Sequence, residues 1–313
     1  MRILAVFFIL ACFACHGQNL DTVIPLKFEK DLIPEGIALD PVSHKVYLNS
    51  LKSAKIVRCN LDGSDAEEFL SSHQYEYLSG FGMTIMENTL YALGNGLSKE
   101  SNSSILLLLD IISGDFINAY PLDNGKFVYL NDIAVDSKGT VYITDSESSD
   151  IYTVNQNTNK LEVFFSNDEI KHSNGIAISE DEKQLYLASY TSGIRVLDIT
   201  KKKLINQPNT FKGIDGMKFY RNSLIGIVNA KRDPTQNGVF QFGLNANGSE
   251  IISENKISDF EHPSDIPTTF AIDEDYMYFV SDSQLDFFDQ ETNAIIDPEQ
   301  LKSYRLIRLK IPL

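Results

Sequence analysis

The sequence predicts an all-β fold, a six-bladed β-propeller whose blades are four-stranded antiparallel sheets. Three observations support this prediction. Short segments in which apolar and polar residues alternate are separated by turns rich in Asn, Asp and Gly, a pattern typical of strands joined in hairpins. One hairpin pattern recurs six times along the chain. The chain shows no convincing amphipathic helix, apart from a turn expected near residues 298–303.

Each copy of the repeat has a short apolar strand, a polar turn of about four residues and a second strand that usually carries Tyr at its centre. Two further strands follow in each unit, as at residues 151–154 and 161–165. Repeated units of four antiparallel strands favour closure into a ring over an open solenoid. The six hairpins lie in residues 36–49, 82–92, 132–144, 175–188, 216–226 and 269–279.

Residues 18–313 are expected to form one propeller domain. If 17 residues are removed from the 313, the remaining 296 give about 49 residues per blade, which is within propeller proportions. The segment 23–28 has the pattern of a strand. We expect it to pair with residues 304–309 of the last blade and so to close the ring.

Residues 1–17 are predicted to be an export signal. Arg2 supplies a basic start, and residues 3–14 form an apolar run that is too short to span a bilayer as a helix. The alternative is a lipoprotein signal with a lipid anchor, because Cys12 and Cys15 each follow an apolar residue and Ala. We therefore expect an exported protein, periplasmic or extracellular, with the lipoprotein as the second interpretation.

The charge balance argues against a nucleic-acid partner. Asp and Glu total 43 against 27 Lys and Arg, which gives a net charge of −16 and repels phosphate backbones. A metal cation or a neutral small molecule is a better partner.

No later segment is apolar for long enough to span a membrane. Removal of the signal leaves Cys59 as the one cysteine, which excludes an intrachain disulfide and a cysteine zinc site. We expect a monomer.

A propeller brings the start of each inner strand and the end of the second strand to one shared opening. Four of the six inner-strand starts carry an oxygen-bearing side chain, and such a mixture of carboxylate and amide oxygens suits Ca²⁺ or a similar hard cation. The alternative is that these residues only form turns. The second-strand ends add Tyr190 and Asn229 to a polar ring. The four inner residues are Glu35, Asn131, Asn174 and Asp215.

These positions resemble the metal-binding motifs of the regucalcin/gluconolactonase (SMP-30/gluconolactonase/LRE-like) family. The family is one of the six-bladed calcium-dependent propellers, which also include paraoxonases and strictosidine-synthase-like proteins. The similarity covers nearly the whole chain after the signal. The matching segments are Pro34-Glu35-Gly36, Asn131-Asp132, Asn174-Gly175 and Asp215-Gly216.

The resemblance implies a divalent-metal-dependent hydrolase of lactones or related esters. Glu35, Asn131, Asn174 and Asp215 would bind Ca²⁺, or another divalent cation such as Zn²⁺ or Mn²⁺. The cation would polarise a carbonyl while Asp215 acts as general base on water. His172 is an alternative base, against the simpler interpretation of a hydrogen-bonded loop histidine.

The chain departs from the sugar-lactonase pattern at the predicted mouth. Tyr129 stands where those members typically carry Arg, and Ile214 replaces the commoner Pro before Asp215. Tyr129, Phe81 and Tyr190, with Asn229, are therefore expected to contact a less polar lactone or ester. Two alternatives remain: a non-catalytic, calcium-stabilised propeller that binds a small molecule or protein, and a condensing enzyme of the strictosidine-synthase kind.

Overall fold

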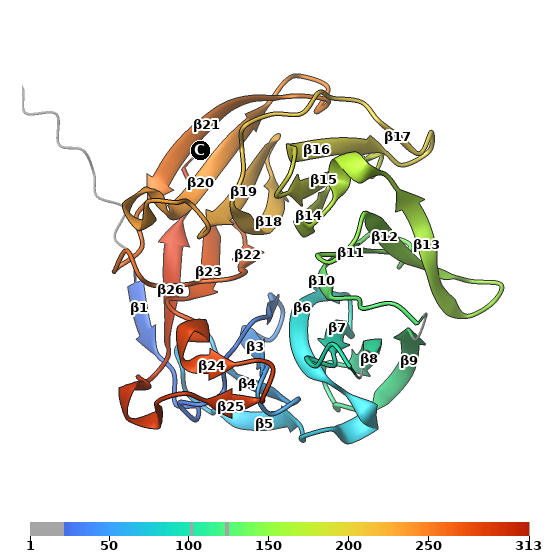
Figure 1. The fold of residues 1–313 in the computed structure, drawn as a ribbon. Coiled ribbons are helices and arrows are strands. Elements are labelled where there is room, and N and C mark those ends of the chain that lie inside the picture. Colours follow the sequence, from blue (N-terminus) through green and yellow to red (C-terminus); the bar gives the residue numbers. More distant parts are fainter. Residues whose placement is uncertain (1–21, 101–102, 123–124, 313) are drawn as a thin grey trace, which may run out of the picture.

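The computed structural model describes residues 22–100, 103–122 and 125–312, and these form a ring of six four-stranded antiparallel sheets around a central axis (Figure 1). The predicted all-β, six-bladed propeller is confirmed. Helices in the described ranges are limited to short 3₁₀ turns, one of which, Pro298–Gln300, falls where a turn was expected. None of the described helices is long and apolar enough to cross a membrane. The predicted signal, residues 1–17, lies outside the described residues.

Blades one to five each contain four strands that are consecutive in the chain, with the first strand innermost. This order follows from the repeated hairpins, because each strand pairs with its predecessor. Blade one is β2 (Ile37–Asp40), β3 (Lys45–Asn49), β4 (Ile56–Asn60) and β5 (Glu67–Leu70). Blade two is β6 (Ser79–Met86), β7 (Thr89–Asn95), β8 (Ser104–Asp110) and β9 (Phe116–Leu122). Blade three is β10 (Leu130–Val135), β11 (Val141–Asp145), β12 (Asp150–Asn155) and β13 (Lys160–Ser166).

Blade four is β14 (Ser173–Ile178), β15 (Gln184–Ser189), β16 (Gly193–Asp198) and β17 (Lys203–Leu204). Blade five is β18 (Ile214–Tyr220), β19 (Ser223–Val228), β20 (Gly238–Leu244) and β21 (Ile251–Ser258). Blade six combines both ends of the described chain: β22 (Ala271–Asp273), β23 (Tyr276–Val280), β26 (Arg305–Lys310) and β1 (Thr22–Pro25).

The ring is closed by pairing between β1 and β26, as the sequence predicts. The two strands are antiparallel, with Thr22 opposite Arg308 and Pro25 opposite Arg305. The hydrogen bond from Leu26 N to Tyr304 O, 2.9 Å long, continues the pairing beyond β1. The first described strand therefore supplies the outer edge of the last blade (Figure 1).

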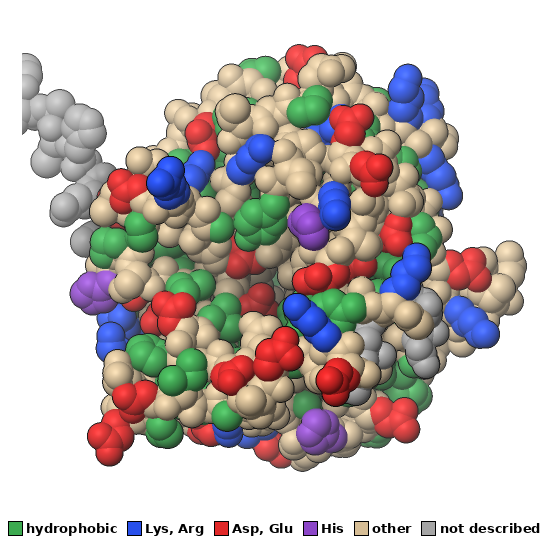
Figure 2. Space-filling view, in the orientation of Figure 1, with side chains coloured by type: hydrophobic (Ala, Val, Ile, Leu, Met, Phe, Trp, Pro, Cys, Tyr) green, Lys and Arg blue, Asp and Glu red, His purple; other side chains and the backbone are tan. Residues whose placement is uncertain are grey.

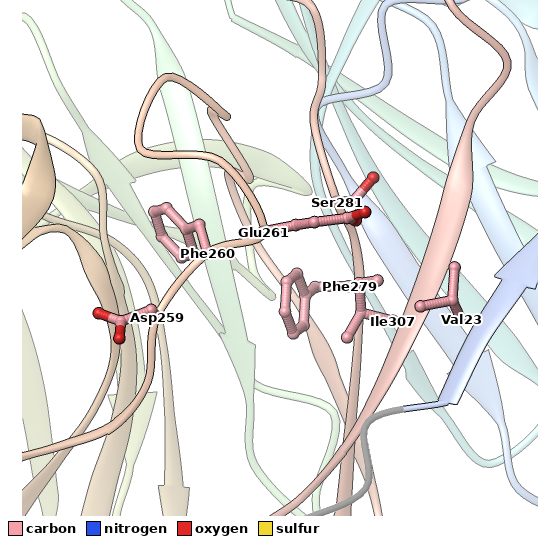
Figure 3. Close-up of a pocket in the computed structure, with 7 residues that line it drawn as sticks. All are labelled: Val23, Asp259, Phe260, Glu261, Phe279, Ser281 and Ile307. Carbon is pink, nitrogen blue, oxygen red and sulfur yellow. The ribbon is translucent and has the colours of Figure 1, made fainter.

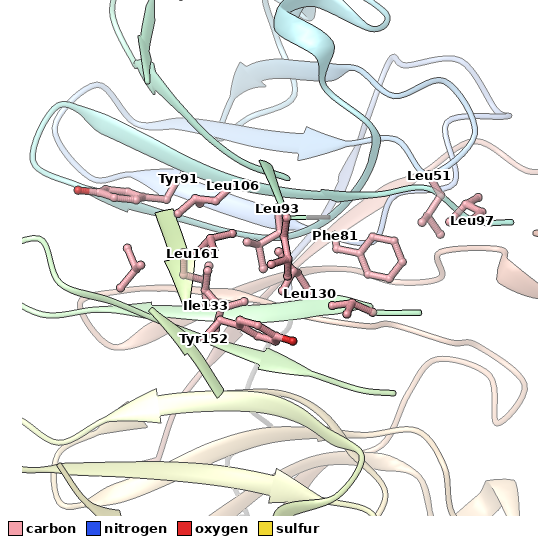
Figure 4. Packing of buried hydrophobic residues seen from close by; sticks show 14 of the residues in the cluster. Leu51, Phe81, Tyr91, Leu93, Leu97, Leu106, Leu130, Ile133, Tyr152 and Leu161 are labelled. Atoms are coloured by element: carbon pink, nitrogen blue, oxygen red, sulfur yellow. The ribbon is translucent and has the colours of Figure 1, made fainter. Parts of the chain in front are cut away.

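The hydrophobic core is divided among the junctions between blades. Each of six clusters of buried residues draws chiefly on two neighbouring blades, and Figure 4 shows the cluster that includes Leu93 and Leu106 of blade two with Ile133 and Tyr152 of blade three. The repeated Tyr of the second strand belongs to these junctions. Tyr186, for example, is fully buried and its hydroxyl donates to Gly248 O of the next blade at 3.1 Å. The repeat therefore encodes packing between blades.

An insertion separates the second and third strands of blade six. It contains the small hairpin of β24 (Phe288–Asp289) and β25 (Ala294–Ile295), which lies over blade one in Figure 1. Phe288 and Leu301 of this insertion belong to the same buried cluster as Leu51 and Leu97 of blades one and two. The insertion thus packs on blades one and two, on the rim where the inner strands begin.

Candidate metal centre

A β-bulge interrupts the inner strand of blades two to five at the same place. In blade five, Ile214 pairs with Val228 and Met217 pairs with Gly226, so β18 has one more residue than β19 between these pairs. A bulge leaves its extra residue unpaired and re-aims the side chain. The residues inside the four bulges are Phe81 and Gly82, Asn131 and Asp132, Asn174 and Gly175, and Asp215 and Gly216.

Glycine after the site residue lets neighbouring inner strands approach closely. A Cβ on Gly175 would lie 2.4 Å from the carbonyl oxygen of Asp215, and a Cβ on Gly82 would lie 2.5 Å from that of Asn131. Neither distance is compatible with a real side chain. Blade three departs from this pattern because Asp132 occupies the glycine position, and its side chain is buried among the inner strands.

One small cavity on the axis is lined by the bulges of blades three to five and by Glu35, which lies just before β2. The cavity volume is about 10 Å³, which is room for a single ion or water. Figure 2 shows acidic side chains gathered around the hollow at the centre of the ring. All four predicted metal ligands line the cavity, and its lining residues are Glu35, Gly82, Asn131, Asp132, Asn174, Asp215, Gly216 and Thr269.

Glu35 provides the strongest sign that this cavity holds a cation. Its Oε2 is buried and accepts no hydrogen bond, the one side-chain oxygen or nitrogen of that kind in the described part of the chain. Burial raises the pKa of Glu35 well above its usual range, and the negative charges of Asp215 and Asp132 raise it further. A hydrogen bond from the Thr268 side chain opposes this rise. A buried carboxylate oxygen without a partner is costly, so a bound cation is the natural partner for Oε2.

Asp215 lies on the same axis with one carboxylate oxygen already bonded. Asn229 Nδ2 donates to Asp215 Oδ2 at 2.6 Å. Burial raises the pKa of Asp215 to about 7, with the charge of Asp132 adding to the rise and hydrogen bonds from Asn229 and Asn174 opposing it. A carboxyl group with that pKa can accept a proton from water near neutral pH, as a general base must.

The donor set fits a hard divalent cation. Glu35 and Asp215 offer carboxylate oxygens, and Asn131 and Asn174 offer amide oxygens, the ligands that Ca²⁺ takes. The amide nitrogen of Asn131 donates to Ser146 Oγ at 3.4 Å, which leaves its carbonyl oxygen free. No group of three or more His, Cys, Asp or Glu with metal-binding geometry occurs among the described residues, so the amides are needed to complete this site.

His172, the alternative base, lies in a loop at the rim. Its backbone is left-handed, with φ of 54°, and its Nδ1 is 2.8 Å from Ser146 O. It does not line the axial cavity. Asp215 therefore lines the predicted cation site and His172 does not. The role of either residue stays a prediction.

The predicted substrate residues surround the rim. The rings of Phe81 and Tyr129 are 5.2 Å apart, and Phe127 extends the cluster at 4.8 Å from Tyr129. The Tyr129 hydroxyl donates to Leu97 O at 3.0 Å, and burial raises its pKa to about 12. Tyr190 keeps 39% of its surface exposed, and its pKa is raised by burial and by the charge of Asp215.

The Asn229 side chain forms its hydrogen bonds within the protein. Besides Asp215, its amide nitrogen donates to Pro267 O of blade six at 2.9 Å. In the structure it therefore orients Asp215 and links two blades, and its contact with substrate stays a prediction.

Sequence reasoning assigned no role to two charged residues at the axis, Asp132 and Lys218. The Lys218 ammonium lies 3.1 Å from Asp132 Oδ1. Asp132 could have been found by aligning the repeats, because it replaces the glycine present in four of the other five inner strands. Lys218 carries no such signal, since strict alternation along β18 would place it on the face opposite Asp215.

A larger hollow lies away from the axis, and none of the predicted metal ligands lines it. It measures about 170 Å³ and lies beside β26, lined by apolar residues that include Phe260, Phe279 and Ile307 (Figure 3). Its acidic residues, Asp259 and Glu261, bind Lys256 and Arg305. The axial cavity is therefore the candidate site although it is smaller.

The fold and the centre together define a class of protein, the six-bladed propellers with an oxygen-lined cavity on the axis. A sequence model of the SMP-30/Gluconolactonase/LRE-like region matches residues 33–226, well over half of the chain, and the chain belongs to this family. Curated protein sequences yield no match.

Solved structures with the same architecture come from proteins of different activities. A gluconolactonase from Xanthomonas campestris is 15% identical with a TM-score of 0.59, and covers 93% of this chain and 90% of its own. The calcium-binding protein regucalcin from Agrobacterium tumefaciens is 16% identical with a TM-score of 0.56, covering 92% and 93%. A PQQ-bound aldose sugar dehydrogenase from Streptomyces coelicolor, 12% identical with a TM-score of 0.59, covers 93% and 99%. At these identities the likeness shows the fold alone.

Proposed function

We propose that this protein is an exported, divalent-metal-dependent hydrolase of small lactones or related esters. The observation that carries the proposal is the buried, unpartnered Oε2 of Glu35 beside Asp215, on the axis of a gluconolactonase-family propeller. Ca²⁺ is the proposed cation, with Zn²⁺ and Mn²⁺ as alternatives. Glu35, Asn131, Asn174 and Asp215 would hold it.

The mechanism assigns separate tasks to the residues around the cavity. The bound cation would supply polarisation of the scissile carbonyl. Asp215 would take the proton from the attacking water, and Asn229 would hold the Asp215 carboxylate in position through the bond to Oδ2. Phe81 and Tyr129 would bind the apolar part of the substrate, since their rings form a cluster at the rim.

A hydrolysis screen tests the proposal. Acid release would be followed by pH-stat on sugar lactones, acyl and aromatic lactones and aryl esters, each with Ca²⁺, Mn²⁺, Zn²⁺ or EDTA. We expect metal-dependent turnover, and a loss of 10²-fold or more in kcat for Asp215→Asn. Asp115→Asn, an exposed residue in the turn before β9, is the matched control and should keep full activity. Unchanged turnover in Asp215→Asn would exclude this residue as the base.

One observation favours a second function, a non-catalytic propeller stabilised by calcium. The axial cavity of about 10 Å³ accommodates an ion but not the acyl group of a substrate. If the screen detects no turnover while Ca²⁺ raises the melting temperature, this binding propeller becomes the better account. Failure to bind any divalent cation would contradict both functions.

A further inference from the structure

Lys218 forms an ion pair at the axis. Its Nζ lies 3.1 Å from Asp132 Oδ1 and 3.2 Å from Oδ2, so the ammonium is shared by both oxygens. The Asp132 side chain is only 4% exposed, and it also accepts hydrogen bonds from the backbone nitrogens of Ile133 and Ile176. The Asp132 carboxylate is therefore held in a fixed position inside the protein, unlike the carboxylates of the exposed ion pairs on the outer strands.

The pair crosses the central channel. Lys218 belongs to blade five and Asp132 to blade three, and the two blades are separated by blade four. Lys218 also lines a hollow of about 340 Å³ with Thr84, Ile133 and Ile176, which come from the inner strands of blades two, three and four. The bulge in β18 allows Asp215 and Lys218, three residues apart, to face the same channel.

The charged groups at the axis leave a net charge of −2, which one divalent cation would neutralise. Three carboxylates line the cavity, from Glu35, Asp132 and Asp215, and no Lys or Arg lines it within the described ranges. Lys218 bound to Asp132 cancels one of the three negative charges, which leaves two. Without Lys218 the centre would hold three negative charges and would favour a more highly charged ion.

We propose that Lys218 is a positioning and specificity residue that sets the charge of the axial centre for a single divalent cation and keeps Asp132 from serving as a third anionic ligand. The inference rests on the proposed function, because it assumes that a cation binds at this centre. It assigns Lys218 no contact with substrate.

Direct ion titration tests the proposal without reference to activity. The affinities of Ca²⁺ and La³⁺ would be measured by calorimetry at pH 8 for the wild type, Lys218→Met, Lys218→Arg, Asp132→Asn and the double variant Asp132→Asn/Lys218→Met. Removal of one positive charge changes the binding free energy in proportion to the charge of the ion. We expect Lys218→Met to tighten Ca²⁺ binding by about tenfold and La³⁺ binding by about thirtyfold.

The other variants separate charge from structural support. Lys218→Arg keeps the charge and should bind Ca²⁺ within about twofold of the wild type. Asp132→Asn leaves the ammonium unpaired and should weaken binding by about tenfold, while the double variant should return close to the wild type. If Lys218→Met fails to fold, as judged by circular dichroism, the comparison of Asp132→Asn with the double variant measures the same charge effect.

Three results would overturn the inference, and they can be told apart. If the wild type binds Ca²⁺ but folded Lys218→Met binds both ions with unchanged affinity, Lys218 does not set the charge, and the proposed function stands. Failure of the double variant to recover would identify Asp132 as a direct ligand and also reject the inference. If the wild type binds neither ion, the proposed function fails together with the inference.

Discussion

Two buried carboxyl groups on the axis dominate the chemistry at the scale of single residues. Glu35 has no hydrogen-bond partner for Oε2, and Asp215 has Asn229 on one oxygen. Because burial disfavours the charged forms, both groups have raised pKa values in the absence of a cation. A divalent ion between them would reverse this effect and favour the ionised forms. Stability, metal binding and pH are therefore coupled at this point.

The first prediction concerns the pH dependence of stability in EDTA. The pKa of Asp215 rises from 3.8 to about 7 on folding, so the folded state holds a proton that the unfolded state releases. The resulting stability is complete below about pH 4 and is lost as pH rises through 7, and the loss from pH 5 to 8 is on the order of 3 kcal/mol. Thermal unfolding at pH 5, 6, 7 and 8 would measure it.

Asp215→Asn provides the control, since the amide does not titrate and the pH dependence should shrink. An excess of Ca²⁺ should also flatten the curve at the alkaline end, because the cation stabilises the ionised carboxylates. Equal or greater stability at pH 8 than at pH 5 in EDTA would contradict the raised pKa of Asp215.

Convergence of single residues on the axis could be predicted where their signal was repeated. Glu35, Asn131, Asn174 and Asp215 line one cavity because they occupy equivalent positions in four blades. Asp40 and Asp136, at the other ends of inner strands, accept hydrogen bonds from the turns that follow them. Lys218 could not be found in this way, because its position depends on an unpaired residue in the strand.

The bulge is the decisive feature at the scale of strands. It turns both Asn131 and Asp132 of blade three toward the same cavity, although neighbouring residues in a regular strand face opposite sides. The glycine that follows in other blades has no side chain, which lets the next inner strand pack directly against it. The centre therefore requires close packing of backbone against backbone.

The second prediction tests this packing. In Gly175→Ala the new Cβ would lie 2.4 Å from Asp215 O, so we expect a loss of about 1–3 kcal/mol in unfolding free energy and weaker Ca²⁺ binding, because Asp215 must move. Chemical denaturation and calorimetry would measure the two effects. Gly94→Ala, whose nearest neighbour would be 3.1 Å away, is a milder substitution of another buried strand glycine and should leave Ca²⁺ binding unchanged.

Equal losses in the two variants would show that the contact between Gly175 and Asp215 has no special importance. A loss of stability in Gly175→Ala without any change in Ca²⁺ affinity would separate the packing of β14 against β18 from the cation site.

Closure of the ring is the main question at the scale of the whole molecule. The buried clusters lie between blades, so each blade depends on both of its neighbours for its core. The junction of blades six and one includes Leu26 and Tyr304, which join the two ends of the described chain. Separation of those ends would expose β26 as a free edge.

The third prediction follows from this closure. A chain that begins at Leu26 lacks β1 and should melt at least about 5 °C below a chain that begins at Gln18. It should also associate with itself, because β26 becomes an unpaired edge strand. Scanning calorimetry and light scattering would detect the two changes. Identical melting of the two chains would show that pairing of β1 with β26 contributes nothing to stability.

The sequence by itself determined the number of blades, the order of strands within them and the closing strand, because alternation and turn residues are local preferences that recur in every unit of the repeat. It also indicated the four oxygen-bearing residues, since equivalent positions in repeated units converge in a ring. Only the tertiary structure decided where the bulges fall and brought Lys218 to Asp132. It also left Glu35 Oε2 without a partner. The ion pair joins two blades that are not neighbours, and the bulges are single extra residues that a pattern of strict alternation does not reveal.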